Sequence, residues 1–192
     1  MGAKVSTSGG ADDDINSRLC KARAVFGKLS GVWKSSILSK STKIRIFKSN
    51  VIAVLLYGCE SWRMTKAKLD TFQHKCLRRL LKIYWPMHVS NEEVRRRANN
   101  ETISELVRKR RWTWIGLVLH MDNSYLPRVA LTWAPEGKRK RGRPKETSRR
   151  TVEKERMAMG LNSWVEAGLA AANRVSWRSM ISGPILHSEG RN

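Results

Sequence analysis

The stretch Thr42-Lys-Ile-Arg-Ile-Phe-Lys-Ser-Asn-Val-Ile-Ala-Val-Leu-Leu-Tyr-Gly58 decides the fold class of this chain. Its apolar side chains recur every three or four residues, at Ile44, Phe47, Val51, Val54 and Leu55. That spacing is typical of one face of an α-helix. Ser41 and Thr42 are candidate N-caps, and Gly58 is a natural helix end. Because residues 51–57 are apolar on nearly every side, we expect this helix to lie at the centre of a core.

Helical periodicity continues on both sides of this stretch. Upstream, a stripe runs through Ile15, Leu19, Ala22, Phe26, Leu29 and Trp33, and Asp12, Asp13 and Asp14 suit the positive end of the helix dipole. Downstream, a stripe runs through Leu69, Phe72, Cys76, Leu80 and Ile83, from Thr65 to just before Trp85-Pro86. Three amphipathic helices predict a small bundle over residues 12–84, with Trp33 and Phe47 in one core.

More helices are expected after the bundle, over residues 85–135 and 152–192. A short helix starts at Asn91, and Thr102 with Glu105 predicts the capping box of a longer one. We expect its apolar face to carry Ile103, Leu106, Val107, Trp114, Leu117, Val118 and Met121, with Trp112 about 160° away from Trp114. Residues 131–135 look extended, and one or two helices follow. The predicted fold class is all-α.

The net charge of the chain indicates which classes of molecule it can bind. The 192 residues include 38 basic and 16 acidic side chains, a formal charge of +22, which favours a polyanion, nucleic acid first and an anionic membrane surface second. The longest apolar run, residues 51–57, is far short of the ~20 residues that span a bilayer. Cys20, Cys59 and Cys76 show no disulfide framework or zinc spacing, so we expect reduced thiols in the cytosol or nucleus.

Composition changes abruptly at residues 138–150, which contain eight basic side chains, one acid and no apolar side chain. Such a segment cannot bury itself, so residues 136–151 are predicted to be a disordered linker, and residues 1–11 a flexible N-terminus. Arg141-Gly142-Arg143-Pro144 matches the core of an AT-hook, in which arginines enter a narrow A·T minor groove. The alternatives are a nuclear-localisation run and a charged linker that binds any polyanion.

A second basic cluster, Arg108–Arg111, is followed by Trp112 and Trp114. A base stacked on an exposed tryptophan beside arginines is one interpretation, and two tryptophans buried between helices is the other. The predicted nucleic-acid-binding residues are Lys138, Arg139, Lys140, Arg141, Gly142, Arg143, Pro144, Lys145, Arg149, Arg150, Arg108, Lys109 and Arg111.

Three further patterns bear on catalysis and on membrane anchoring. Asp12–Asp14 resembles a metal-binding pair, but the helical stripe that follows favours a helix start. Met1-Gly2-Ala-Lys-Val-Ser6 fits an N-myristoylation pattern, which is too short to carry a membrane prediction. The four histidines share no spacing with each other or with cysteine. We expect no catalytic residues, no metal and no cofactor.

Short motifs run through nearly the whole chain, roughly residues 9–180. They are Phe26-x-x-Leu29-x-x-x-Trp33, Thr42-Lys43, residues 55–62, Phe72, residues 76–79, Ile83-x-Trp85, Arg110-Arg111-Trp112-x-Trp114-x-Gly116, Pro127, Ala130-Leu131-x-Trp133, residues 137–145 and Trp177-Arg178. In this order they resemble the region C-terminal to the palm in non-LTR retrotransposon reverse transcriptases.

This resemblance implies that residues 12–84 are the thumb, which grips template–primer duplex, and that the remainder is the basic C-terminal region of an endonuclease–reverse transcriptase. It also implies that the palm and endonuclease lie upstream of Met1, so the isolated chain is not an enzyme. We therefore expect a nucleic-acid-binding part of an RNA-directed DNA polymerase, acting in the nucleus after synthesis in the cytoplasm. The ligand is RNA, an RNA–DNA hybrid or duplex DNA. The alternative is an independent nuclear AT-hook-type DNA-binding protein.

Overall fold

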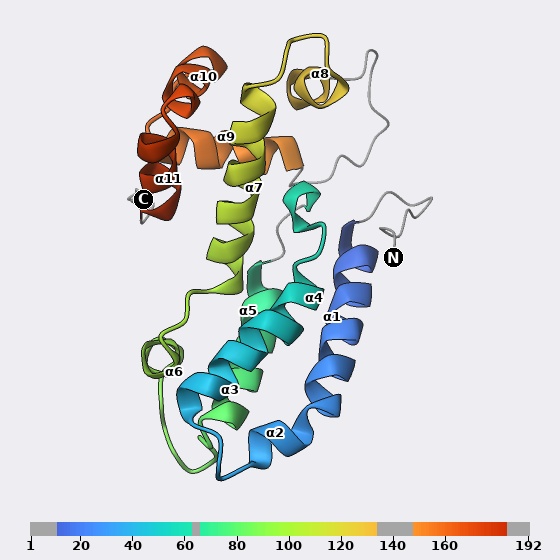
Figure 1. Ribbon diagram of the computed structural model, residues 1–192, viewed down its shortest axis with the longest axis vertical. Helices are drawn as coiled ribbons and strands as arrows, with labels where there is room; N and C mark the ends of the chain where they lie inside the picture. Colours follow the sequence, from blue (N-terminus) through green and yellow to red (C-terminus); the bar gives the residue numbers. More distant parts are fainter. Residues whose placement is uncertain (1–10, 63–65, 134–147, 184–192) are drawn as a thin grey trace, which may run out of the picture. The chain divides into compact units, whose positions relative to one another are not determined.

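The computed structural model describes residues 11–62, 66–133 and 148–183. Over these ranges the regular secondary structure is entirely helical, which confirms the predicted all-α class (Figure 1). The chain divides into two compact units, Met1–Val107 and Arg108–Asn192. The N-terminal unit therefore extends beyond residue 84, where the sequence pattern placed the end of the bundle.

The first predicted helix is two helices, α1 (Ala11–Lys28) and α2 (Ser30–Lys34). Asp12–Asp14 lie in the first turn of α1, which confirms the expected helix start. Asp14 accepts a hydrogen bond from the indole nitrogen of Trp62 at 2.9 Å and pairs with Arg18 at 3.8 Å. This carboxylate therefore links the first turn of α1 to Trp62, which follows the central helix in the sequence.

The central helix has three parts: α3 (Lys40–Ile46), the π-helical segment η1 (Phe47–Ile52) and α4 (Ala53–Leu55). Its N-cap is Ser39, whose hydroxyl accepts from the backbone N–H of Thr42 at 3.1 Å, and not Ser41 or Thr42 as the sequence suggested. The wider π turn brings Phe47, Val51 and Ile52 onto the buried side together. Gly58 adopts a positive φ of 71°, as the predicted helix end requires, and a short 3₁₀ turn, η2 (Cys59–Ser61), follows.

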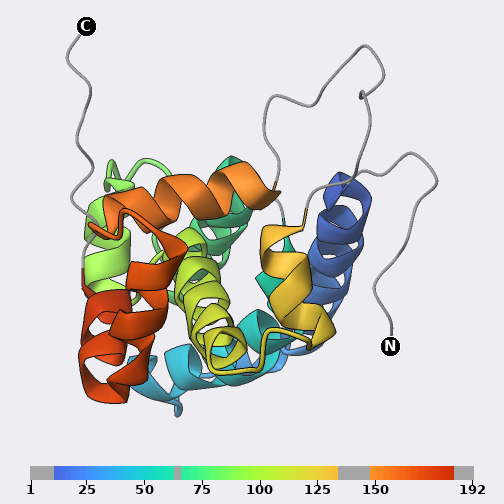
Figure 2. The same ribbon diagram turned by 90° about the horizontal axis from the view of Figure 1, so that it is seen from above.

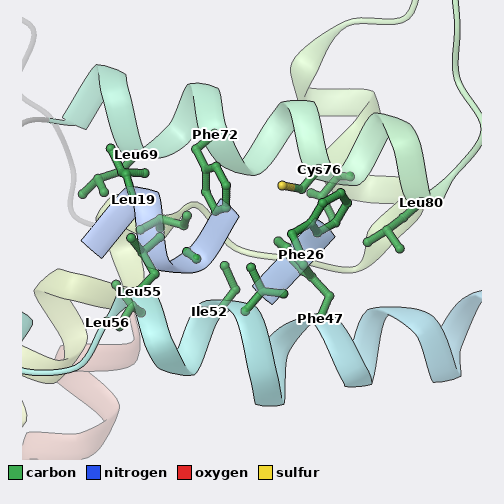
Figure 3. Close-up of a cluster of buried hydrophobic side chains, with 14 of the residues drawn as sticks. Leu19, Phe26, Phe47, Ile52, Leu55, Leu56, Leu69, Phe72, Cys76 and Leu80 are labelled. Atoms are coloured by element: carbon green, nitrogen blue, oxygen red, sulfur yellow. The ribbon is translucent and has the colours of Figure 1, made fainter. Parts of the chain in front are cut away.

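The core of the N-terminal unit forms where α1, the central helix and α5 (Lys66–Leu80) meet (Figure 3). Phe26 lies between the two residues expected to share this core. Its ring stacks on Trp33 with centroids 5.1 Å apart and meets Phe47 edge-on at 6.1 Å. The prediction that Trp33 and Phe47 belong to one core is confirmed.

The unit closes with α6 (Asn91–Ala98) and the first turn of α7 (Ile103–Leu119). The predicted capping box is present, because Thr102 and Glu105 each accept a hydrogen bond from the other's backbone N–H, at 3.1 and 2.9 Å. The buried side chain of Gln73 donates to the Glu101 carbonyl and accepts from the Ile103 N–H. These bonds tie the start of α7 to α5, which explains why the unit continues to residue 107.

The C-terminal unit contains the rest of α7, α8 (Leu126–Thr132), α9 (Ser148–Ala158), α10 (Trp164–Ala172) and α11 (Arg174–Ser182). Figures 1 and 2 show α9 running across α7, and α10 beside α11. Three helices follow residue 147 where the sequence pattern predicted one or two. Leu131 lies in α8, so the prediction of an extended segment from residue 131 is wrong there; Pro127 in the first turn of α8 favours a helix start.

Candidate nucleic-acid interface

Positive charge is shared evenly between the two units. The N-terminal unit has 20 basic and 9 acidic residues, and the C-terminal unit has 18 and 7, so each has a formal charge of +11. A charge of this size on a unit of about 100 residues strengthens the attraction to any polyanion.

Each acidic side chain in the described part of the C-terminal unit has a partner within the unit. The four are Asp122 with Ser124, Glu153 with Arg156 and Trp164, Glu155 with Arg111 and Trp112, and Glu166 with the Asn162 N–H. Hydrogen bonds from the backbone N–H and hydroxyl of Ser124 lower the pKa of Asp122. Glu153 and Glu155 on α9 bond to Trp164 and to Arg111 and Trp112, so these two carboxylates hold neighbouring helices together.

Arg111, a predicted nucleic-acid contact, lies inside the helical core. Only 1% of its side chain is exposed, and its guanidinium is 2.6 Å from Glu155 on α9. The other oxygen of Glu155 accepts from the indole nitrogen of Trp112 at 2.8 Å. Arg111 therefore serves to hold α9 against α7 in this structure.

The remaining residues of this cluster lie in different environments. Arg108 is buried and donates to the backbone carbonyl of Gly183 at 3.1 Å. Lys109 is half-buried, and Arg110, which the sequence interpretation left out, is exposed. In this cluster Arg110 and part of Lys109 are exposed to solvent, while Arg108 and Arg111 are buried. Sequence spacing did not reveal this division, because it depends on which side of α7 the later helices cover.

The two tryptophans of α7 also separate. Trp112 is fully buried, stacked on Trp164 with centroids 6.4 Å apart and edge-on to Trp177 at 6.0 Å. Trp114 is 41% exposed, and Leu117 and Met121 on the same stripe are exposed as well. The predicted apolar face of α7 is therefore wrong at Trp114, Leu117 and Met121, whereas Val118 is buried as predicted. Helices α9–α11 cover the side that carries Trp112, Ile115 and Leu119 instead.

Of the basic run at residues 138–150, the structure describes only residues 148–150. Lys138–Lys145, with the AT-hook-like Arg141–Pro144, lie outside the described residues. Arg149 and Arg150, predicted to belong to the linker, lie in the first turn of α9, where Arg149 is exposed and Arg150 half-buried. Lys154 follows one turn after Arg150 and is exposed.

The three thiols lie in different environments. Cys59 and Cys76 are buried, Cys20 is exposed, and all three are free thiols. Burial raises the pKa of the Cys76 thiol to about 12, so it remains protonated at neutral pH. Burial, and then the nearby Arg95, lowers the pKa of His74.

The described ranges contain no group of three or more His, Cys, Asp or Glu side chains arranged to hold a metal ion. None of their helices combines the length and the apolar character that crossing a bilayer requires.

Residues 25–57, from the last turn of α1 to just beyond the central helix, match the family described as Domain of unknown function (DUF6451). No curated protein and no solved structure matches the chain.

Proposed function

We propose that this chain is a nucleic-acid-binding part of a non-LTR retrotransposon reverse transcriptase, holding template–primer or target DNA in the nucleus mainly through charge. The observation that carries the proposal is the formal charge of +11 on each of the two units. Such a unit presents mostly positive side chains to solvent. The motif order along the chain supplies the link to the retrotransposon enzymes.

Binding of this kind is expected to be insensitive to base sequence. Lysine and arginine contacts to phosphates release condensed counterions, and this release dominates non-specific affinity. A polymerase-associated segment must hold any template, so a largely sequence-blind surface suits the proposed role. The proposed contribution of this chain is to hold the nucleic acid.

The salt dependence of affinity tests the proposal. Fluorescence anisotropy would follow the full chain binding labelled single-stranded RNA, RNA–DNA hybrid and duplex DNA between 50 and 300 mM salt (roughly the range over which such affinities change most). If about five cations meet phosphates of duplex DNA, log K falls against log salt with a slope of about −4.5. No detectable binding to any of the three at the lowest salt contradicts the proposal.

Two variants test which cations of the chain contact the phosphates. Replacing Lys138, Arg139, Lys140 and Lys145 with Ala should flatten the slope and weaken binding to all sequences alike. The control replaces Arg96 and Arg97 with Ala, which removes two cations of the N-terminal unit that share one carboxylate, Glu93, at 2.7 Å. An effect of the control about half that of the four-residue variant would mean that total charge, and not the basic run, sets the affinity.

A further inference from the structure

The ring of Trp114 is an exposed aromatic group on α7. It is 41% exposed, although its neighbours Trp112 and Ile115 are fully buried. Arg110, one helical turn earlier, and Leu117, nearly one turn later, lie on the same side of α7 and are also exposed. An aromatic ring and a guanidinium therefore lie side by side on one surface of the C-terminal unit.

The backbone beneath this surface is firmly held. Trp112 is packed between Trp164 and Trp177, and its indole nitrogen donates to Glu155. On the next turn, Gly116 lies directly against the ring of Trp177. Because these contacts fix the middle of α7, Trp114 is presented on a rigid support, which lowers the entropy lost when a ligand orders the ring.

We infer that Trp114 is a stacking platform for an unpaired base, with Arg110 contacting the adjacent phosphate, so that the preferred ligand is single-stranded nucleic acid. The inference rests on the proposed function and narrows it to a substrate class. Stacking needs an accessible base face, which single strands offer and continuous duplex does not.

The charge of the C-terminal unit favours a nucleic acid over a second copy of this chain as the ligand of this surface. Trp114 belongs to a unit of charge +11, and Lys109 and Arg110 lie within the same turn and a half of helix. A second copy docking here would bring two strongly positive units together, whereas a polyanion offsets them.

Four variants of the full chain test the inference by anisotropy at one fixed salt concentration. Trp114→Ala should weaken binding of a 12-nucleotide single-stranded RNA or DNA about tenfold and leave binding of a 12-base-pair duplex unchanged. Trp114→Phe, which keeps an aromatic face, should restore most of the loss. Leu117→Ala controls for the same surface, and Trp85→Ala controls for an 89% exposed tryptophan in the other unit. Circular dichroism melting would confirm that every variant is folded.

Photocrosslinking provides a second, positional readout. A 5-iodouracil oligonucleotide irradiated with the wild-type chain should label the tryptic peptide 112–128, at Trp114 and not at the buried Trp112. An unchanged single-strand affinity of Trp114→Ala overturns the inference, as does equal weakening for single strand and duplex. If that variant alters sedimentation of the chain without altering RNA affinity, the surface is a protein contact. If the wild-type chain binds no nucleic acid at all, the proposed function itself fails.

Discussion

Trp177 donates its indole N–H to the backbone carbonyl of Trp112 across 3.3 Å, although 65 positions separate the two residues in the sequence. This carbonyl lies in the middle of α7, and a side chain at position 116 would block the approach of the indole ring. The approach depends on Gly116, because a Cβ built at this glycine would lie 2.3 Å from the indole nitrogen of Trp177. The only residue type that fits without a shift is therefore glycine.

This relationship predicts that Gly116→Ala destabilises the chain by about 1–3 kcal/mol through overpacking. Gly168→Ala is the matched control in the same unit, since nothing lies within 4 Å of its added Cβ in the middle of α10. That change should stabilise the helix by up to about 1 kcal/mol. Thermal melting followed by circular dichroism measures both. Equal effects of one sign at the two glycines would show that Trp177 does not pack against Gly116.

Phe47 tests the core of the N-terminal unit. Its side chain is fully buried in contact with Phe26, so Phe47→Ala should lower the free energy of unfolding by about 3–5 kcal/mol. Ile37 is 93% exposed, and Ile37→Ala should change it by less than about 0.5 kcal/mol. Urea titration gives both values. A loss below about 1 kcal/mol for Phe47→Ala would contradict the packing of the central helix against α1.

The ion pair between Arg111 and Glu155 tests the attachment of α9. Glu155→Gln removes the negative partner of a guanidinium that is 1% exposed, which should cost about 3–5 kcal/mol. Adding Arg111→Met removes the buried guanidinium that has lost the Glu155 carboxylate, so the double variant should be more stable than Glu155→Gln alone. Urea titration of the two variants makes the comparison. A double variant that is less stable than the single one would show that Arg111 stabilises the chain through contacts other than the ion pair with Glu155.

Glu93 predicts a dependence of stability on pH. Hydrogen bonds from Arg96 and Arg97 lower the pKa of this carboxyl from 4.5 to about 2. Because the pKa falls on folding, the stabilisation is present above 4.5 and is lost as the pH falls toward 2. The difference in stability between the wild-type chain and Glu93→Gln should shrink over that window. An NMR titration supplies the direct value, and replacing Arg96 and Arg97 with Ala should return the pKa toward 4.5.

The AT-hook-like sequence makes a separate prediction about specificity. We expect A·T and G·C duplexes of equal length to bind the full chain with equal affinity, because a polymerase-associated arm reads little sequence. Replacing Arg141 and Arg143 with Ala should then weaken both duplexes alike. Competition binding measures the ratio. A clear A·T preference that these replacements erase would instead favour the independent AT-hook-type DNA-binding protein.

Local patterns in the sequence determined much of the fold. Helical periodicity placed the elements around Phe26, Phe47 and Phe72, and the Thr102–Glu105 spacing predicted a capping box that the structure contains. Gly58 was expected to end a helix and does so with a positive φ. These features depend on residues within a turn or two of each other, so spacing and residue type are sufficient to predict them.

The exposed surface of α7 was decided by tertiary structure alone. The sequence pattern favoured the side with Trp114, Leu117 and Met121 as buried, yet the helix is apolar on two sides after residue 108. Periodicity cannot choose between two apolar sides of one helix. The choice came from Trp177, Trp164 and Glu155, which lie more than 40 positions later in the sequence and pack on the side of Trp112.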